Sequence, residues 1–196
     1  GKESTFCGNG GRCIAAFAHH QKIINGSATY EAVDGIHNAK VSELSSNEYH
    51  VELTMRDILS YKLNDDSLLI DTGSPHYVKK VDDLENLDII NKGAAIRYDK
   101  SISDDGVNVD FLLNKDGVIR IRTYERGVEN ETLACGTGVT ASAIAASLWF
   151  GGDNIDIYTQ IAKLNVRFQK ENNTFRNVVL SGPATHVFDG IFIFAK

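Results

Sequence analysis

Alternating apolar and polar positions dominate the pattern along this chain. Successive side chains of a strand point to opposite faces, so an alternation with a period of two predicts a strand with one buried face. Turn-forming residues separate such segments, for example at Asn25-Gly26 and Asp34-Gly35. Short turns between alternating segments favour a mainly antiparallel sheet over a parallel βαβ fold. The segments predicted to be strands are residues 39–44, 50–55, 107–111, 118–122, 164–168, 177–180 and 190–194.

Two segments interrupt this alternation and predict helices. Residues 12–20 and 140–150 are apolar and rich in alanine, which is typical of a nearly buried helix. A third, weaker helix is predicted at 82–90, with Asp82 as its N-terminal cap and Asn91-Lys92-Gly93 as its stop signal. Strands combined with a few helices predict an α+β architecture.

The composition is that of an ordinary globular protein and narrows the functional classes. Of the 196 residues, 42% are apolar and 23% are charged, which excludes an intrinsically disordered chain. The net charge of −6 argues against nucleic-acid binding, although small anions can still bind to local donors. No apolar run is long enough to span a membrane, and no signal-peptide pattern is present, so we expect a cytoplasmic protein.

The two alanine-rich helices begin with the same motif. Cys7-Gly8-Asn9-Gly10 precedes one helix, and Cys135-Gly136-Thr137-Gly138 precedes the other. A repeated cysteine is rarer than a repeated glycine, so we favour a degenerate internal duplication over chance similarity. Superposing the two motifs also aligns two pairs of alanines, Ala15 with Ala143 and Ala18 with Ala146.

The repeated cysteines suggest a reaction. A helix N-terminus favours the thiolate form of a cysteine, and its free N–H groups can hold a carboxylate. Two such motifs facing each other would place a thiol on each side of one small acid. That arrangement suits racemisation or epimerisation by two bases, without pyridoxal or a metal. Buried packing is the alternative role for Cys7 and Cys135.

Other roles for the cysteines are less well supported. Three cysteines in a chain of this length do not form a disulfide scaffold. Cys13 lacks a glycine turn of its own, so we predict that it belongs to the core. Neither the cysteines nor the six histidines have the spacing of zinc ligands, and we therefore expect no metal. The two-base reaction needs no cofactor, and we expect none.

Several blocks of the sequence resemble the diaminopimelate epimerase family. They are Phe6–Cys13, Tyr124–Gly138, Gly73–His76, Asn108–Phe111 and Ser181–Ala184. The resemblance implies an α+β fold of two pseudo-symmetric half-domains, each with antiparallel strands wrapped around a central helix. It assigns residues 1–57 and 183–196 to the first half-domain and residues 58–182 to the second, with the substrate in the cleft between them.

The same resemblance implies roles for individual residues. Cys7 and Cys135 would be the catalytic thiols, and His76 and Glu125 would tune them. From the residues alone, a surface ion pair remains the alternative for Glu125 with Arg126, and a core histidine remains the alternative for His76. The implied substrate contacts are Gly8, Asn9, Gly136 and Thr137 at the reacting carboxylate, Glu125, Arg126 and Asn108 at the polar ends, and Ser74, which stands where the family usually has asparagine.

The implied reaction is the cofactor-independent epimerisation of LL-diaminopimelate to meso-diaminopimelate, in lysine and peptidoglycan-precursor biosynthesis. The implied partner is that small-molecule substrate, with no nucleic acid and no membrane, and a homodimer is left open. Family members carry several strands before the first cysteine motif. We therefore expect this chain to lack much of its first half-domain and to expose unpaired strand edges and apolar surface.

Three alternatives stay open. Proline and hydroxyproline racemases also use two cysteines, but they typically have histidine where Asn9 stands and act on a monocarboxylate. Asn9 and Glu125-Arg126 therefore favour the diaminopimelate reaction. A redox-switchable binding protein would instead use Cys7 and Cys135 as a reversible pair, without exchange of an α-hydrogen. A folded but catalytically inert fragment is the third alternative.

Overall fold

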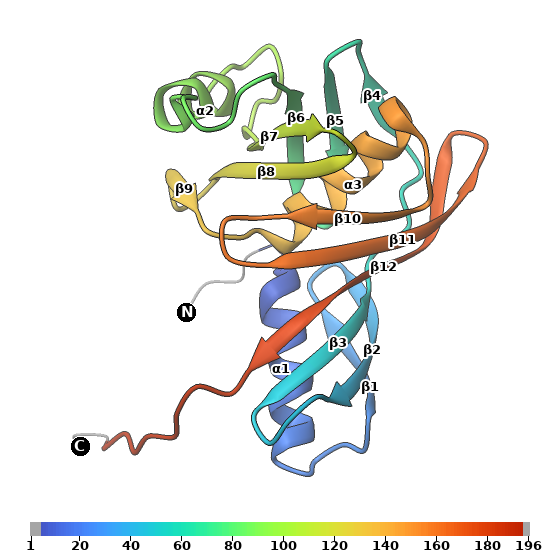
Figure 1. Cartoon of the computed structure of the whole chain (residues 1–196), viewed down its shortest axis with the longest axis vertical. Coiled ribbons are helices and arrows are strands. Elements are labelled where there is room, and N and C mark those ends of the chain that lie inside the picture. Colours follow the sequence, from blue (N-terminus) through green and yellow to red (C-terminus); the bar gives the residue numbers. More distant parts are fainter. Residues whose placement is uncertain (1–4, 194–196) are drawn as a thin grey trace.

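The protein combines helices with one large sheet, and the computed structural model describes its residues 5–193 (Figure 1). The helices of this range are α1 (Gly8–His20), α2 (Ile89–Arg97) and α3 (Gly136–Phe150). Six of the seven predicted strand segments are strands, and the predicted α+β class is confirmed. The strands are β1 (Ser27–Ala32), β2 (Gly35–Glu43), β3 (Glu48–Thr54), β4 (Tyr61–Leu63), β5 (Ser67–Asp71), β6 (Pro75–Lys80), β7 (Asn108–Lys115), β8 (Val118–Glu125), β9 (Asn130–Thr132), β10 (Asn154–Tyr158), β11 (Lys163–Glu171) and β12 (Thr174–Thr185).

The strands of residues 5–193 form a single sheet of mixed direction. Their order is β1-β2-β3-β12-β11-β10-β8-β7-β6-β5-β4, with β9 paired to β8. The pairs β6–β7 and β8–β10 are parallel, and every other neighbouring pair is antiparallel. The prediction of a mainly antiparallel sheet is therefore confirmed.

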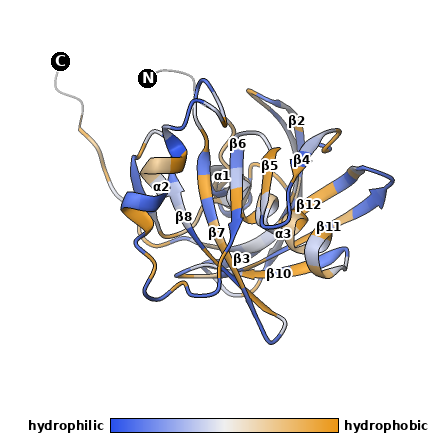
Figure 2. Ribbon diagram, turned by 90° about the horizontal axis from the view of Figure 1, so that it is seen from above, coloured by the Kyte–Doolittle hydropathy of each residue, from blue (hydrophilic) through white to orange (hydrophobic). Residues whose placement is uncertain are grey.

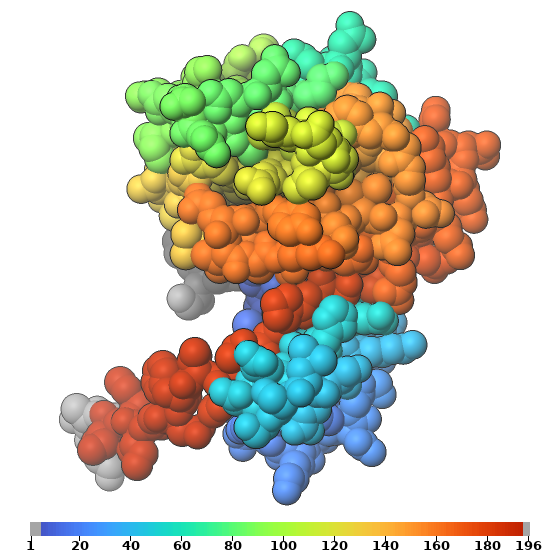
Figure 3. All heavy atoms as spheres, viewed as in Figure 1, coloured from blue at the N-terminus to red at the C-terminus, as the bar shows by residue number. Residues whose placement is uncertain are grey.

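The sheet bends into a larger and a smaller lobe, which Figure 3 shows one above the other. In the larger lobe α3 contacts strands β5, β6, β7, β8, β10 and β11, which surround it in the view of Figure 2. In the smaller lobe α1 packs against β1, β2, β3 and β12. Strand β12 belongs to both lobes, because residues 174–181 pair with β11 and residues 179–185 pair with β3.

Helix α3 is the core of the larger lobe. Its residues 136–147 are all buried, and Ala141, Ala143, Ala145 and Ala146 are each 0% exposed. Small side chains allow strands to approach the helix from every side, and a helix that is apolar all round is a core helix. Among the described residues, no helix is long and apolar enough to cross a membrane.

Helix α1 is buried on one face only. Ala15 and Ala16 are buried, whereas Ile14 is 55% and Phe17 is 49% exposed. The prediction of a nearly buried helix is therefore correct for α3 and wrong for α1. The exposed side of α1 forms an apolar groove of about 730 Å³ with β1, which pairs only with β2 within residues 5–193.

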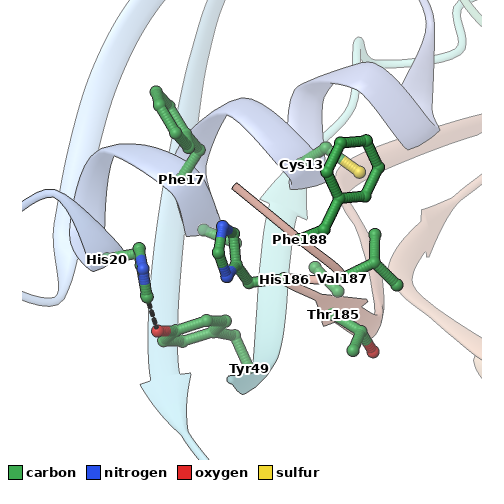
Figure 4. A pocket seen from close by; sticks show the side chains of 10 residues that line it. Cys13, Phe17, His20, Tyr49, Thr185, His186, Val187 and Phe188 are labelled. Atoms are coloured by element: carbon green, nitrogen blue, oxygen red, sulfur yellow. Dashed lines mark hydrogen bonds between the residues drawn. The ribbon is translucent and has the colours of Figure 1, made fainter. Parts of the chain in front are cut away.

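Cys13 is not a core residue. The sequence predicts a core position for Cys13, but this residue is exposed because it lies off the buried face of α1. It lines a small cavity of about 180 Å³ where the segment after β12 runs beside the helix (Figure 4). There His186 stacks on His20 with ring centroids 4.2 Å apart, and His20 Nδ1 shares a hydrogen bond of 2.7 Å with the Tyr49 hydroxyl.

Two predicted elements are also wrong. The helix predicted at 82–90 begins only at Ile89, because Asp88 is its cap and accepts a hydrogen bond from Asn91 N at 3.0 Å. Gly93, the predicted stop, lies inside α2, where a Cβ would be 2.5 Å from Tyr124 Cβ. The strand predicted at 190–194 is irregular over residues 190–193, and Phe194 lies outside the described residues.

Candidate active site

Each repeated cysteine is the N-terminal cap of a helix. Cys7 precedes α1 and Cys135 precedes α3, and both have an extended backbone. The Cys7 thiol accepts a hydrogen bond from Gly10 N at 3.3 Å. Cys7 is exposed, and Cys135 is buried. Neither helix carries an acidic residue in its first turn, so the positive ends of both helix dipoles are uncompensated by the chain.

The two helix N-termini meet at a pair of glycines. A Cβ at Gly136 would lie 2.8 Å from Gly8 Cα, and a Cβ at Gly8 would lie 3.1 Å from Gly136 Cα. Real Cβ atoms do not approach a backbone this closely, so the contact requires glycine on at least one side. The sequence repeat is thus a spatial contact, which places the free N–H groups of two helices next to each other.

Asn9 and Arg12 hold this junction together. Asn9 Nδ2 donates to Ala134 O at 2.8 Å, which ties α1 to the residue before Cys135. Arg12 Nη2 donates to Asn9 Oδ1 at 2.9 Å and so fixes the direction of the Asn9 amide. Burial lowers the pKa of Arg12, although the neighbouring thiols of Cys13 and Cys7 oppose this shift. Sequence reasoning assigned no role to Arg12, but a charged residue within an apolar helix could have indicated one.

A buried chain of polar groups leads from β7 and β6 to Cys135. His76 is 0% exposed, and its Nε2 lies 2.9 Å from Thr137 Oγ1, which in turn lies 3.3 Å from Cys135 Sγ. The other ring nitrogen, Nδ1, lies 2.7 Å from a carboxylate oxygen of Asp110. Burial acts to lower the pKa of His76, but Asp110 and the Cys135 thiol outweigh it and raise this pKa to about 10.

Asn108 joins three further segments of the predicted site. Its Nδ2 donates to Ser74 Oγ at 2.8 Å and to Pro75 O at 3.1 Å. Its Oδ1 accepts from Arg126 N at 2.9 Å. Asn108 and Ser74 are both buried, so in this structure the Asn108 amide organises the starts of β6 and β7 and the loop after β8.

Glu125 and Arg126 lie at the end of β8, and both are partly exposed. Glu125 Oε2 accepts from Thr132 Oγ1 at 2.7 Å, and Arg126 Nη1 donates to Gly106 O at 3.3 Å. Within residues 5–193, Glu125 and Arg126 do not form an ion pair with each other. The structure therefore connects them to the site through the backbone of Arg126, while their charged groups point to other partners.

Most of the predicted residues thus form one connected region with two parts, whereas the charged groups of Glu125 and Arg126 lie outside it. Gly8, Asn9 and Gly136 make the helix junction, next to Cys7 and Cys135. His76, Thr137 and Asn108 make the buried polar chain behind Cys135, and Ser74 and Arg126 are linked to it. The groove beside α1 reaches Cys7, but its lining does not include Cys135. Sequence reasoning missed Asp110 and Thr123, which complete the polar chain.

Comparison with known proteins identifies the family of this chain. The family model for diaminopimelate epimerase matches residues 68–187. A protein of Flavobacterium psychrophilum named diaminopimelate epimerase is 44% identical over 192 residues, which cover 96% of this chain and 73% of the relative. A Hydrogenobaculum protein of the same name is 39% identical over 201 residues, covering 97% and 71% of the two chains.

Solved structures share the fold at much lower identity. A phenazine biosynthesis protein of the PhzF family from Bacillus anthracis superposes with a TM-score of 0.71 and 12% identity, covering 98% of this chain and 78% of that protein. A predicted epimerase from Pseudomonas aeruginosa gives 0.62 and 12%, covering 91% and 73%. These two likenesses concern the fold alone. With the cysteine-capped helices in contact and relatives matched over nearly the whole chain, the protein belongs to the diaminopimelate epimerase family.

Proposed function

We propose that the protein converts LL-diaminopimelate to meso-diaminopimelate by a two-base mechanism, with Cys7 and Cys135 as the two bases. The observation that carries the proposal is the backbone contact between Gly8 and Gly136, each directly after a cysteine that caps a helix. The names of the relatives supply the substrate class. The pathway would be the synthesis of lysine and peptidoglycan precursors.

In this mechanism one cysteine acts as a thiolate and removes the α-hydrogen from one face of the substrate. The other cysteine acts as a thiol and delivers a proton to the opposite face. An α-hydrogen of an amino acid is only weakly acidic, so the negative charge that develops on the α-carboxylate must be stabilised. The N–H groups of Gly8, Asn9, Gly136 and Thr137 would supply this stabilisation at the two helix N-termini.

The remaining residues would tune the thiols and hold the distal part of the substrate. His76 reaches Cys135 through Thr137, which supports a role in setting the proton distribution at that thiol. A guanidinium suits a distal carboxylate and a carboxylate suits an ammonium group, which supports Arg126 and Glu125 as substrate-binding residues. Asn108 and Ser74 would assist by fixing the loop that carries Arg126.

Hydrogen exchange during turnover tests the proposal. In deuterium oxide, the meso product formed early should carry solvent deuterium at the inverted carbon, while unreacted substrate keeps its hydrogen. The variants Cys7→Ala and Cys135→Ala should each lose epimerisation, because each direction needs both groups. Product that retains the hydrogen of the substrate would indicate a single base and contradict the proposal. Thiol oxidation without any α-hydrogen exchange would favour the redox-switchable binding protein instead.

A further inference from the structure

One buried carboxylate has no part in the reaction described so far. Asp110 of β7 is 0% exposed, and both of its oxygens have a donor. Oδ2 lies 2.7 Å from His76 Nδ1, and Oδ1 accepts from the Thr123 hydroxyl at 2.7 Å. Within residues 5–193, His76 is the only basic side chain at ion-pair distance from this carboxylate.

The sheet and α3 fix the position of this carboxylate. Asp110 is paired directly with Thr123 across β7 and β8, and with Val78 across β6 and β7. The first turn of α3 covers it closely, because a Cβ at Gly138 would lie 2.4 Å from Asp110 Oδ1. The glycine at position 138 of the repeated motif therefore makes room for the carboxylate.

The hydrogen bonds around His76 place a proton on Nδ1 and leave Nε2 able to carry a second one. A carboxylate only accepts, so His76 Nδ1 must carry a hydrogen toward Asp110. Asn108 Nδ2 approaches Nε2 at 3.4 Å, but its two hydrogens are already directed at Ser74 Oγ and Pro75 O. Nε2 is thus free to donate to Thr137 Oγ1, whose own hydrogen then points to Cys135 Sγ.

We propose that Asp110, oriented by Thr123, is a positioning residue that holds His76 as an imidazolium and, through the Thr137 hydroxyl, holds Cys135 as a thiolate. The proton of Cys135 moves to Thr137 Oγ1, the hydroxyl proton of Thr137 moves to His76 Nε2, and one proton is transferred overall. The resting enzyme is then ready for the substrate whose α-hydrogen faces Cys135. Only this consequence for turnover rests on the proposed function.

Two ionisable groups act on His76 from the elements packed around it. Asp110 faces it from β7 and Cys135 faces it from the start of α3, whereas Thr123, Asn108 and Ser74 are uncharged. A buried carboxylate without its cation is strongly unfavourable, so the charge of Asp110 and the proton of His76 depend on each other. Removing the charge of Asp110 should therefore change the protonation of His76 and not only the stability of the fold.

The charge state of His76 is the direct test, and it requires no catalysis. Nitrogen chemical shifts of the histidine-labelled full chain should show both ring nitrogens of His76 protonated at pH about 8, well above the ordinary histidine pKa of about 6.5. A neutral His76 at this pH in the unsubstituted protein would overturn the inference. A charged His76 in a protein without epimerase activity would contradict the proposed function and leave the inference standing.

Variants then show whether Asp110 is responsible. In a Cys7→Ser, Cys13→Ser background, Cys135 is the only thiol. The ratio of thiolate to thiol at Cys135, measured by ultraviolet absorbance, should fall about tenfold or more with Asp110→Asn, as expected for a histidine pKa lowered by at least about one unit. Thr123→Val is the matched control, because it removes the buried hydroxyl and leaves the charge. Equal losses of absorbance in the two variants would contradict the assignment of Asp110.

Turnover supplies a further readout if the unsubstituted enzyme is active. Asp110→Asn should move the pH profile of kcat while leaving KM nearly unchanged, because Asp110 touches no substrate. The same substitution should add nothing to the profile in a His76→Asn background, since Asp110 acts through His76. An additional shift of the profile in that background would show that Asp110 acts by another route.

Discussion

Two glycines in contact determine how close the helix ends can come. Gly8 and Gly136 are the first residues of α1 and α3. A Cβ at Gly136 would clash with Gly8 Cα at 2.8 Å, and a Cβ at Gly8 would be tightly packed at 3.1 Å from Gly136 Cα. Gly10 differs, because a Cβ there would meet only Cys7 atoms at 3.6 Å, an ordinary contact distance. The glycines of the repeated motif are therefore not equivalent, although the sequence alone treats them alike.

This difference predicts opposite effects of the same substitution. Gly136→Ala should destabilise the fold by about 1–3 kcal/mol, the usual range for overpacking, because the two helix ends must separate. Gly10→Ala should be neutral or stabilising by up to about 1 kcal/mol, since alanine is the better helix former. Urea unfolding of both variants measures these free energies. Equal unfolding midpoints would show that the close approach of the helices is not required.

The pKa of His76 predicts how stability depends on pH. Its value in the folded protein is raised from 6.5 to about 10, so the bound proton favours the folded state. This contribution to the free energy of unfolding is fully present below pH about 6.5 and is lost as the pH rises through about 10. Urea unfolding at a series of pH values should show the decline. The double variant His76→Gln, Asp110→Asn removes both charges and should lack this decline. If the free energy of unfolding falls equally with pH in the variant and the unsubstituted protein, the raised pKa of His76 is contradicted.

At the scale of elements, the sequence predicts the long strands and misses all those of six residues or fewer, namely β1, β4, β5, β6, β9 and β10. The predicted segments, four to six residues long, correspond to β2, β3, β7, β8, β11 and β12, the strands with seven or more residues. β4 and β9 have three residues each, too few to show a period. Cys13 was misplaced because an apolar segment was treated as buried all round, whereas α1 has one exposed face.

Part of the candidate site also cannot be predicted from local sequence. Alternation in β7 indicates that Asn108 and Asp110 face water, but residues 108–112 of this strand are all buried. Val109 and Phe111 pack into the cluster beside α2, and the opposite face of the strand is covered by α3. The cysteine motifs could be predicted from local sequence. The partners of His76 could not, because they depend on how β6, β7, β8 and α3 come together.

The repeated helices differ in their surroundings, and a matched pair of substitutions measures this. Ala146 of α3 is 0% exposed, whereas Ala18, its counterpart in α1, lines the open groove beside β1. Ala146→Leu should cost about 1–3 kcal/mol because no space is available, and Ala18→Leu should cost much less. Thermal or urea unfolding compares the two. A large loss of stability for Ala18→Leu would mean that the groove is closed in solution.

At the scale of the whole molecule, the lobes meet at the helix junction and along β12. We propose that they correspond to the two half-domains predicted at 1–57 with 183–196 and at 58–182. The predicted boundary at residue 183 falls within β12, which continues through both lobes as one strand. Relative movement of the lobes would therefore be transmitted to the two cysteines through the junction and this strand.

The junction predicts a specific disulfide. Cys7 and Cys135 are each one residue from the Gly8–Gly136 contact, and a disulfide requires Cα atoms within about 7 Å. Mild oxidation with a disulfide reagent should link these two cysteines, block the site and be reversed by a thiol reductant. Peptide mapping identifies the bond, with Cys13→Ser as the control that excludes exchange with the third thiol. A Cys7–Cys13 link alone, or no link, would argue against facing thiols.

The route of β12 has a consequence for how the protein folds during synthesis. The ribosome synthesises β3 (Glu48–Thr54) early and β12 late. These two strands pair, with residues 179–185 of β12 lying against β3. Contacts between distant parts of a chain form slowly, since loop closure must precede them. The smaller lobe should thus wait for almost the whole chain, and amides of β3 and β12 should gain protection together in pulsed hydrogen exchange. Earlier protection of β3 would show that it does not need β12. On a growing chain, Cys7 and Cys135 would then come together only after the rest of the fold is nearly complete.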